Sequence, residues 1–399
     1  PPFFFLMIRL PPISTLFPNT TLFRSKPNEG GTCKMKKRKV LAVLLCAAMT
    51  AALAVGCGGS KGSDSSDKSS DSSSSSDDVI TVGFSQVGAE SDWRTANSQS
   101  MKDTFSKENG YDLIFDDAQQ KQENQITAIR NFIQQEVDYI LLAPVTETGW
   151  DTVLQEAKDA DIPVIIVDRM VDVSDDSLYT TWIGTDALCE GRKAAEWLNG
   201  FAEAKGIAAS DIHIADIQGT IGSTAQIGRT KGLEEGVDKY GWDLVAQQTG
   251  EFTQAKGQEV MESMLKQYDN INVVYCENDN EAFGAIDAIE AAGKTVGSDI
   301  ANGEIMVISF DTTHAGLQDV LDGKIECDVE CNPLHGPRAE ELIKKLEAGE
   351  DVDKLNYVDE EIFAHDDTVK SVKATNSLDE EKDFDVTPLT QDILDKRAY

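Results

Sequence analysis

The sequence predicts an α/β protein built of two doubly wound parallel-sheet lobes that are joined by a hinge. Three observations predict this fold class. From Val79 onward, short β-branched runs alternate with longer segments of helical period, which is typical of parallel sheets flanked by helices. The runs are mostly apolar throughout, as expected for strands that helices cover on both faces. One series of this kind is followed by a second of similar length, so two lobes are expected.

The first lobe is expected to span residues 79–183. Its strands are predicted at Ile80–Phe84, Asp112–Phe115, Tyr139–Leu142 and Pro163–Val167, and its helices near Trp93–Asn109, Gln119–Gln135 and Glu147–Asp159. In the second of these helices, Ile126, Ile129 and Ile133 form one apolar stripe that can face a sheet. A short extended segment at Thr180–Thr185 is predicted to be the first hinge crossing.

The second lobe is expected to span residues 184–330. Its strands are predicted near Ile212–Ile217, Asp243–Gln247, Asn272–Tyr275 and Ile305–Ser309, and its helices near Ala187–Ala204, Ser223–Lys239, Gln254–Gln267 and Glu281–Ala291. The remaining segments are predicted to be a strand at Ile325–Glu330, a helix at Gly336–Ala348, a strand at Tyr357–Phe363 and an acidic tail to Tyr399. Together they are too small for a third domain. We expect residues 331–356 to complete the first lobe and residues 357–399 to complete the second.

Residues 1–34 cluster Phe and Pro without a usable period, so they fit neither a core helix nor a strand. We interpret them as a non-native leader, and an unusual native leader is the alternative. Residues 35–56 are predicted to be a signal peptide, because the basic run Lys36–Lys39 precedes the apolar run Val40–Val55. That run is shorter than the roughly 20 residues of a membrane span.

The apolar run ends in Leu53-Ala54-Val55-Gly56-Cys57, which resembles a bacterial lipobox with Ala54 where Leu is commonest. The signal is therefore predicted to be that of a lipoprotein, with Cys57 lipidated; an ordinary signal with an incidental Cys is the alternative. Residues 57–78 are interpreted as a lipid anchor and tether, since residues 58–78 hold eleven Ser and no apolar side chain that could offset ordering entropy. The protein is expected outside the cytoplasm, anchored to the outer face of a Gram-positive membrane or in a periplasm.

The charge of the chain disfavours nucleic acid as a partner. The formal net charge is -34, and beyond residue 40 no cluster of Lys and Arg stands out. Residues 1–56 hold eight basic residues and one acidic residue, so from Cys57 onward the chain carries 28 basic and 69 acidic residues. Such a surface repels phosphates and anionic membranes, so contact with the membrane is expected through the lipid anchor only.

Polar side chains follow the carboxyl ends of five predicted strands, where ligands bind in open α/β sheets. They are Glu90, Ser91, Asp92, Trp93 and Arg94 after the first strand, Asp168 and Arg169 after the fourth, and Arg229, Asn278 and Asp311 in the second lobe. Carboxylates accept hydrogen bonds, arginine donates them through a planar fork, and an aromatic face can cover the C–H side of a sugar ring. The alternatives are a core aromatic at Trp93, a surface ion pair at Asp168 and Arg169, and a solvated helix charge at Arg229.

Six stretches carry a resemblance to a known family. They are VGFSQVGAESDWR at Val82–Arg94, QQKQENQ at Gln119–Gln125, VDR at Val167–Arg169, QGTIGSTAQIGRTKG at Gln218–Gly232, GEFTQAKGQEVMES at Gly250–Ser263 and END at Glu277–Asp279. Over about residues 80–348 the chain resembles the type I periplasmic sugar-binding proteins of ABC transporters, of the ribose/galactose class, and most closely the galactofuranose-binding members. The resemblance implies that the strand-end residues line an interlobe ligand site, with Glu330 as a further member. Two departures, at Thr312 and in the length of Cys331–Pro337, leave the ligand's identity open.

The resemblance implies an extracytoplasmic solute-binding lipoprotein that captures a neutral sugar between its lobes and delivers it to an ABC permease. The expected sugar is a galactofuranose-like hexose or a pentose, and the expected state is a monomer. The alternative is a ligand-sensing protein that presents a sugar or an autoinducer-2-type ligand to a chemoreceptor or sensor kinase. A sugar-responsive repressor is disfavoured, because an export signal stands where a helix-turn-helix would be.

No enzymatic activity, cofactor or metal site is expected. The four His residues lack metal-ligand spacing, no HExxH or CxxC motif occurs, and the first strand is not followed by GxGxxG. Four Cys remain after the predicted anchor. Cys327 and Cys331 are expected to lie about 13 Å apart on a strand, too far for a disulfide. A pair between Cys189 and Cys276 stays open beside the alternative of buried free thiols.

Overall fold

The structure is a computed structural model that describes residues 79–399, and it confirms the predicted fold class. The predicted leader, signal peptide, lipidated Cys57 and tether lie outside the described residues. Within residues 79–399, no helix combines the length and apolar character that crossing a membrane would require.

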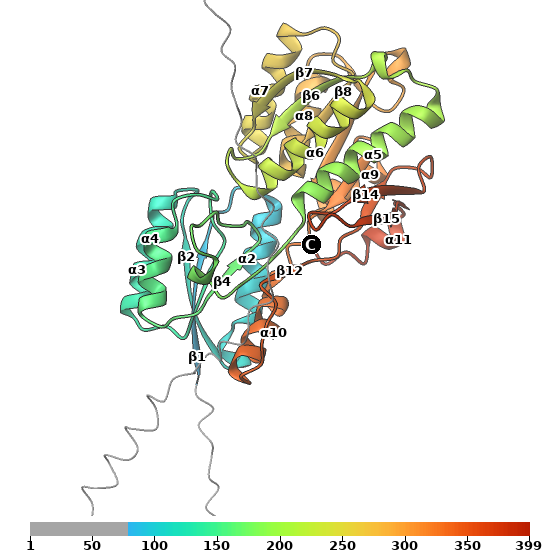
Figure 1. Cartoon of the computed structure of the whole chain (residues 1–399). Helices are drawn as coiled ribbons and strands as arrows, with labels where there is room; N and C mark the ends of the chain where they lie inside the picture. Colours follow the sequence, from blue (N-terminus) through green and yellow to red (C-terminus); the bar gives the residue numbers. More distant parts are fainter. Residues whose placement is uncertain (1–78) are drawn as a thin grey trace, which may run out of the picture. The chain divides into compact units, whose positions relative to one another are not determined.

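The first lobe is a six-stranded sheet whose strands are all parallel, in the order β12-β5-β4-β3-β1-β2. The strands are β1 (Ile80–Gln86), β2 (Tyr111–Asp117), β3 (Tyr139–Leu142), β4 (Val164–Val167), β5 (Thr181–Gly184) and β12 (Leu355–Tyr357). The helices are α2 (Asp92–Thr104), α3 (Gln122–Gln134), α4 (Asp151–Asp159) and α10 (His335–Glu347). In Figure 1, α3 and α4 lie on one side of this sheet and α2 and α10 on the other. The sheet is therefore covered on both faces, which explains why β3 and β4 consist of apolar residues only.

The second lobe is built around a sheet in the order β16-β13-β11-β10-β8-β6-β7, with β9 beside β10. Its strands are β6 (His213–Gln218), β7 (Asp243–Thr249), β8 (Val273–Cys276), β9 (Thr295–Val296), β10 (Glu304–Asp311), β11 (Cys327–Glu330), β13 (Ile362–Ala364) and β16 (Thr387–Pro388). Its helices are α5 (Ala187–Lys205), α6 (Thr224–Tyr240), α7 (Gln254–Gln267), α8 (Asp279–Ala291), α9 (His314–Leu321) and α11 (Gln391–Leu394). Of the pairs in this sheet, β11 with β13 is antiparallel.

The chain crosses between the lobes in three short segments, and two sequence predictions about them are corrected. Most of the segment predicted as a hinge, Thr180–Thr185, is strand β5 of the first sheet, so the first crossing is limited to residues 185–186. The strand predicted at Tyr357–Phe363 is two strands in different sheets. A single strand cannot pair in both sheets, so residues 358–361 form another crossing. Residues 331–334 connect β11 to α10 as the remaining crossing.

The acidic tail is folded rather than extended. Strands β14 (Ser371–Thr375) and β15 (Glu381–Asp385) form an antiparallel hairpin, and β14 contacts α5. Short 3₁₀ turns complete the structure at Lys107–Asn109, Asp176–Leu178, Ala209–Asp211 and Ile300–Asn302.

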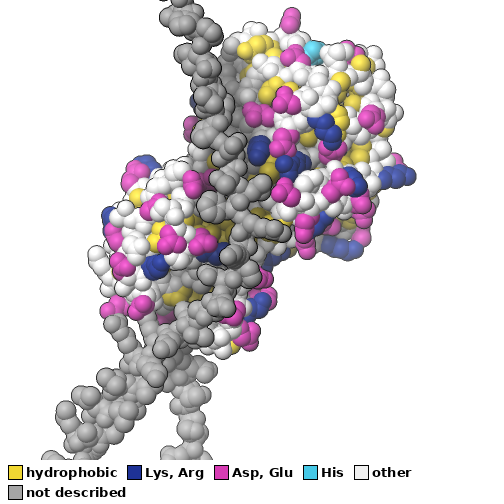
Figure 2. Space-filling view, viewed as in Figure 1, with side chains coloured by type: hydrophobic (Ala, Val, Ile, Leu, Met, Phe, Trp, Pro, Cys, Tyr) yellow, Lys and Arg dark blue, Asp and Glu magenta, His cyan; other side chains and the backbone are white. Residues whose placement is uncertain are grey.

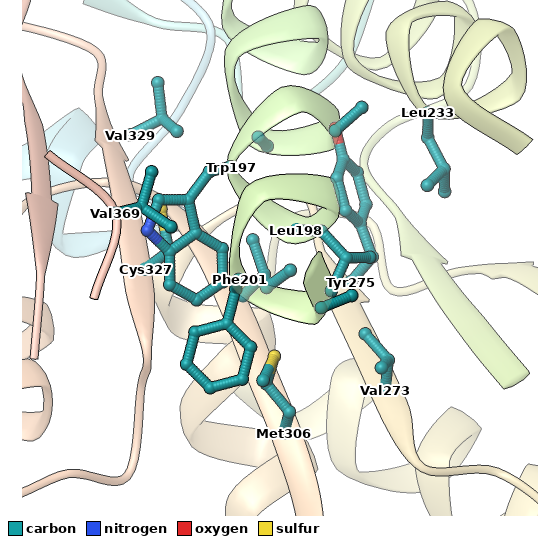
Figure 3. Close-up of a cluster of buried hydrophobic side chains, with 14 of the residues drawn as sticks. Trp197, Leu198, Phe201, Leu233, Val273, Tyr275, Met306, Cys327, Val329 and Val369 are labelled. Carbon is teal, nitrogen blue, oxygen red and sulfur yellow. The ribbon is translucent and has the colours of Figure 1, made fainter. Parts of the chain in front are cut away.

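One of the two hydrophobic clusters of the second lobe lies between α5 and the sheet. Figure 3 shows Trp197, Leu198 and Phe201 of α5 beside Met306 of β10 and Val273 of β8. The indole ring of Trp197 stacks on the ring of Phe201 with 5.2 Å between the centroids. These apolar side chains recur at helical spacing, and their burial is what holds α5 on the sheet.

The four described cysteines are free and buried, so the pairing that the sequence left open between Cys189 and Cys276 is absent. Burial raises the pKa of the Cys189 thiol to about 11, which keeps it protonated at neutral pH. On the face shown in Figure 2, acidic side chains are spread over both lobes with Lys and Arg between them.

Leu198→Ala is expected to lower the free energy of unfolding by about 2–5 kcal/mol, because it leaves a cavity in the core. Leu198 is 2% exposed, whereas Leu378, at 54%, is a matched surface control. Leu378→Ala is expected to change stability by less than about 0.5 kcal/mol. Urea unfolding of both variants measures the difference, and equal losses would contradict this account of the core.

Candidate binding site

A small cavity lies between the two lobes, beyond the carboxyl ends of the strands. The first lobe lines it with Glu90, Ser91, Trp93, Arg94, Asp168 and Arg169, the second with Ala225, Arg229, Phe252, Asn278 and Asp311, and the crossing after β11 with Cys331. The structure thus brings together every residue predicted for the site except Asp92 and Glu330. Charged side chains from both lobes face one small space.

Arg94 contacts other polar side chains that line the first-lobe side of the cavity. Ser91 begins α2 as its N-cap, and its hydroxyl accepts a hydrogen bond from the backbone N–H of Arg94 at 3.1 Å. The Arg94 guanidinium donates to Glu90 Oε1 at 3.1 Å and to Gln86 Oε1 at 3.3 Å, and its Nη2 lies 2.8 Å from Asp168 Oδ2. All three nitrogens therefore have protein partners, and Arg94 holds two carboxylates in place.

Arg169 has fewer partners than Arg94. It follows Asp168, whose φ of 65° turns the chain sharply at the end of β4. Its Nη1 donates to the carbonyl oxygen of Val145 at 2.9 Å, but its nearest carboxylate oxygens, on Glu90 and Asp168, are 3.8 and 4.0 Å away. Those two distances exceed a hydrogen bond. Among the described residues, Arg169 therefore has N–H donors without a partner.

The charges of this wall persist at neutral pH. Burial and the charge of Arg94 lower the pKa of Arg169 to about 10. Burial raises the pKa of Asp168, but the charges of Arg94 and Arg169 lower it more, so it stays below its ordinary value. At pH 7 the site therefore contains an ionised carboxylate and two guanidinium ions in contact.

Arg229 is the corresponding cation of the second lobe. It lies on α6, which begins after the N-cap Ser223. Its Nε donates to Glu190 Oε2 at 2.8 Å, and its Nη2 is 3.4 Å from Asp311 Oδ1. Burial alone would lower the pKa of Arg229, but the charges of Glu190 and Asp311 raise it well above its usual range. Arg229 is therefore held as a cation between two acids.

Asn278 and Asp311 are positioned by the backbone at two strand ends. Asn278 is the N-cap of α8, and its Oδ1 accepts from the backbone N–H of Glu281 at 2.8 Å while its Nδ2 donates to the carbonyl oxygen of Phe252 at 3.3 Å. Asp311 ends β10 with a φ of 108°. This left-handed backbone turns the chain at the strand end, where the Asp311 carboxylate pairs with Arg229.

One aromatic ring comes from each lobe. Trp93 donates its indole N–H to the carbonyl oxygen of Cys331 at 2.6 Å, and it is 3% exposed. The ring of Phe252 lies 5.3 Å from the guanidinium carbon of Arg169. A Cβ at position 219 would come within 1.9 Å of the Phe252 ring, so Gly219 is what admits this ring to the site.

The lobes touch each other beside the cavity. The backbone N–H of Asp92 donates to Asn280 Oδ1 at 2.9 Å, and that of Met170 donates to Thr224 Oγ1 at 2.7 Å. Each bond joins residues of opposite lobes. The structure therefore shows the lobes closed around the space between them.

Two predicted site residues do not line the cavity. The side chain of Asp92 is exposed, because the first turn of α2 directs it away from the wall that Trp93 and Arg94 form. Glu330 is turned toward the tail, where its Oε1 accepts from Arg397 Nη2 at 2.7 Å and from the Tyr399 hydroxyl at 2.6 Å. Sequence reasoning expected the tail to complete the second lobe, but it did not predict that Arg397 and Tyr399 would be the partners of Glu330.

Four residues of the site were not predicted. Phe252 follows β7, one of the strand ends that the sequence reasoning left out, and Ala225 lies on the first turn of α6. Applying the strand-end rule to β7 would have found Phe252. Cys331 borders the cavity from a crossing segment, and Glu190 pairs with Arg229 from inside α5. A single acid in an amphipathic helix gives no sequence signal of such a role.

One group of described residues has ligand atoms close enough for a metal, namely Glu190, Cys331 and Glu360, whose atoms lie within 4.8 Å of one another. These residues do not fit a metal ion. The oxygens of Glu190 accept from Thr185 and from the cationic Arg229. Burial raises the pKa of the Cys331 thiol well above its usual range, which disfavours the thiolate that a metal needs.

The sequence pattern of the periplasmic binding protein domain matches residues 82–350 of the chain. The chain belongs to the periplasmic binding protein family. Members of this family are solute-binding proteins, and the recognition made from the sequence is confirmed.

Three proteins are similar to this chain over most of their own length. The galactofuranose-binding protein YtfQ of Escherichia coli is 38% identical over 304 residues, which cover 75% of this chain and 92% of YtfQ. A Mycobacterium smegmatis protein solved in complex with β-D-fucofuranose is 46% identical, with a TM-score of 0.68, covering 72% of this chain and 92% of its own. The binding component of the arabinose ABC transporter from Shewanella sp. ANA-3, bound to α- and β-L-arabinofuranose, is 44% identical, with a TM-score of 0.67 and coverage of 72% and 93%.

Arg397→Met is expected to lower the free energy of unfolding by about 1.5–3 kcal/mol, the usual contribution of a hydrogen bond to a charged group. The substitution removes the cation beside Glu330, which is 4% exposed in its side chain. Lys396→Met is the matched control, since its partner Asp392 and Lys396 itself are both largely exposed, and it is expected to cost less than about 1 kcal/mol. Urea unfolding at pH 7 compares the two, and an equal loss in both would show that Arg397 does not tie down the tail.

Proposed function

We propose that this protein binds a neutral monosaccharide between its lobes, a galactofuranose-like hexose or a pentose, and delivers it to an ABC permease. The balance of charge in the cavity is the observation that carries this proposal. Arg94 pairs with Glu90 and Asp168, and Arg229 pairs with Glu190 and Asp311. Because Arg94 and Arg229 are already paired with protein carboxylates, an anionic ligand would meet like charge at those carboxylates, whereas an uncharged polyol would not.

The hydrogen-bonding capacity of the cavity also suits a sugar. Arg169 has N–H donors without a described partner, and carboxylate oxygens of Asp168 and Asp311 border the same space. A sugar hydroxyl can donate to a carboxylate and accept from a guanidinium at the same time. Charge-assisted bonds of this kind contribute about 1.5–3 kcal/mol each.

The aromatic rings of the cavity narrow the ligand class. Trp93 and Phe252 offer apolar ring surface to the C–H groups of a sugar ring. The galactofuranose, fucofuranose and arabinofuranose in the names of the relatives support a furanose form.

We infer that the lobes close on the ligand and that the closed form is what the permease meets. Periplasmic binding proteins in general close around their ligand by a hinge motion of the two lobes. The direct contacts between lobes at Asp92 and Met170 support a closed state in this chain. Binding in place of catalysis agrees with the family, whose members bind solutes.

We further propose that the protein works outside the cytoplasm as a monomer that lipid on Cys57 anchors. The support is the basic and apolar signal before Cys57 and the Ser-rich segment after it. More than one acyl chain is needed for stable anchoring, and a diacylated Cys would meet that need.

A thermal-shift screen of the protein against pentoses, hexoses and their furanose forms tests the proposed ligand class, because a tight ligand raises stability by mass action. A neutral monosaccharide is expected to raise the melting temperature, and sugar phosphates and sugar acids are not. A response to the anionic sugars alone would refute the argument from charge balance.

Arg169→Ala is expected to weaken binding of the sugar found in that screen by about 2–4 kcal/mol, some thirty- to a thousandfold. The variant removes the cavity arginine whose donors are free for a ligand. Arg130→Ala is the control, because Arg130 pairs with Glu156 on the surface of the same lobe, and it is expected to leave affinity unchanged. Calorimetry measures both, and a loss below threefold in Arg169→Ala would contradict its assignment to the ligand.

Cys57→Ala is expected to release the protein into the medium or the soluble periplasmic fraction, because the lipid could no longer be attached. Fractionation of cells that express the wild type or the variant measures this, with detergent phase partitioning as a second readout. Retention of the variant in the membrane fraction would argue against lipid on Cys57.

A further inference from the structure

The three crossings between the lobes meet at one carboxyl group, that of Glu360. Its Oε1 accepts a hydrogen bond from the backbone N–H of Asn332, in the second crossing, at 2.8 Å. Its Oε2 contacts the hydroxyl of Thr185, in the first crossing. Glu360 itself lies in the third crossing, and its carbonyl oxygen accepts from Lys193 Nζ at 3.2 Å. One side chain therefore connects every covalent link between the lobes.

The hydrogen bonds at the Thr185 hydroxyl determine whether the Glu360 carboxyl group carries a proton. The Thr185 hydroxyl lies 2.5 Å from Glu190 Oε1 and also contacts Glu360 Oε2. A hydroxyl has one proton to donate, so it can serve only one of the two carboxylates. The other carboxyl group has to carry a proton of its own and donate it to the hydroxyl oxygen.

Glu360 is the group that carries this proton. Glu190 accepts a hydrogen bond from the guanidinium of Arg229 at 2.8 Å, whereas the hydrogen-bond partners of the Glu360 carboxyl group among the described residues are the uncharged Asn332 N–H and Thr185 hydroxyl. The charged and titratable groups that face Glu360 are Glu190 and Lys193 on α5, Arg229 on α6 and the Cys331 thiol. Burial and the charge of Glu190 raise the pKa of Glu360 well above its ordinary value, although Lys193 lowers it.

A continuous chain of hydrogen bonds leads from Glu360 to the cavity. It runs from Glu360 to Thr185, from Thr185 to Glu190, and from Glu190 to Arg229, which lines the cavity. We propose that uncharged Glu360 is a positioning residue for the sugar site, which holds the three crossings together and orients Arg229 through Thr185 and Glu190. This inference rests on the proposed function. It assigns Glu360 no contact with the ligand itself.

Loss of the proton would break this arrangement. Two adjacent carboxylates would then compete for the single Thr185 proton, and their like charges would repel. The crossing that carries Glu360 would lose its link to Thr185, and Glu190 would be drawn away from its place beside Arg229. Sugar affinity is therefore expected to fall as the pH rises through the pKa of Glu360.

Glu360→Gln tests the proposal, because the amide can replace the protonated acid at both contacts. Its NH₂ can donate to Thr185 and its oxygen can accept from Asn332. Calorimetric titration of the full chain with the sugar from the ligand screen, between pH 6 and 10, is expected to show tenfold or greater loss of wild-type affinity at the alkaline end. Glu360→Gln is expected to bind within threefold of the wild type at neutral pH and to lack the alkaline loss.

Asp359→Asn is the matched control, since it neutralises the exposed neighbour in the same crossing. It is expected to keep the wild-type pH profile. Glu360→Ala is expected to weaken binding at least tenfold at every pH, because it removes both contacts. A tenfold loss in Glu360→Gln at neutral pH, or an alkaline loss equal to that of the wild type, would overturn the proposal.

A second measurement needs no ligand and separates this inference from the proposed function. When the pKa of a carboxyl group is higher in the folded protein than in the unfolded chain, the protein becomes less stable as the pH rises between those two pKa values. The melting temperature of Glu360→Gln is therefore expected to match the wild type at pH 5 and to exceed it by a few degrees at pH 8. A variant that melts below the wild type at pH 8 would show that Glu360 is ionised, whether or not any sugar binds.

Discussion

The burial of arginine between two lobes is the constraint on which the site depends. A guanidinium removed from water costs several kcal/mol unless carboxylates and hydrogen bonds replace the water. Arg94 and Arg229 meet this requirement with two carboxylates each. The backbone supplies these acids at strand ends, where Asp168 and Asp311 turn the chain with positive φ. Strand-end backbone and charge pairing are thus parts of one arrangement, and Arg169 stands out because its pairing is incomplete.

The same pairing connects the cavity to the crossings between the lobes. Glu190 contacts both Arg229 and Thr185, so it belongs to the ligand side and to the hinge side at once. Trp93 makes a second connection of this kind through the carbonyl oxygen of Cys331. Hydrogen bonds therefore link side chains that line the cavity to the backbone segments that must move when the lobes open. A substitution in the cavity is therefore expected to affect the crossings, and a substitution in the crossings is expected to affect the cavity, because at most two hydrogen bonds separate them.

Sequence reasoning predicted the fold class and most of the strands, because apolar β-branched runs and helical stripes follow from burial on two faces of a sheet. It also predicted five of the strand ends that border the cavity, since topology alone places them at one edge, but it left out the end of β7. It failed where a segment's role depends on distant partners. Tyr357 and Phe363 belong to different sheets, and Glu330 binds Arg397, a residue 67 positions away. Glu190 carries no local pattern at all, because a single helical acid reads as a solvated charge until its partner is known.

The position of α10 and β12 in the chain has a consequence for biosynthesis. Both belong to the first lobe, yet they follow almost all of the second lobe in sequence. A nascent chain therefore lacks one helix and one strand of its first lobe until residue 357 has been made. Neither lobe is one continuous piece of the chain, because β12 completes the first sheet and β13 and β16 complete the second. Completion of both sheets is therefore a late event in the synthesis of the chain.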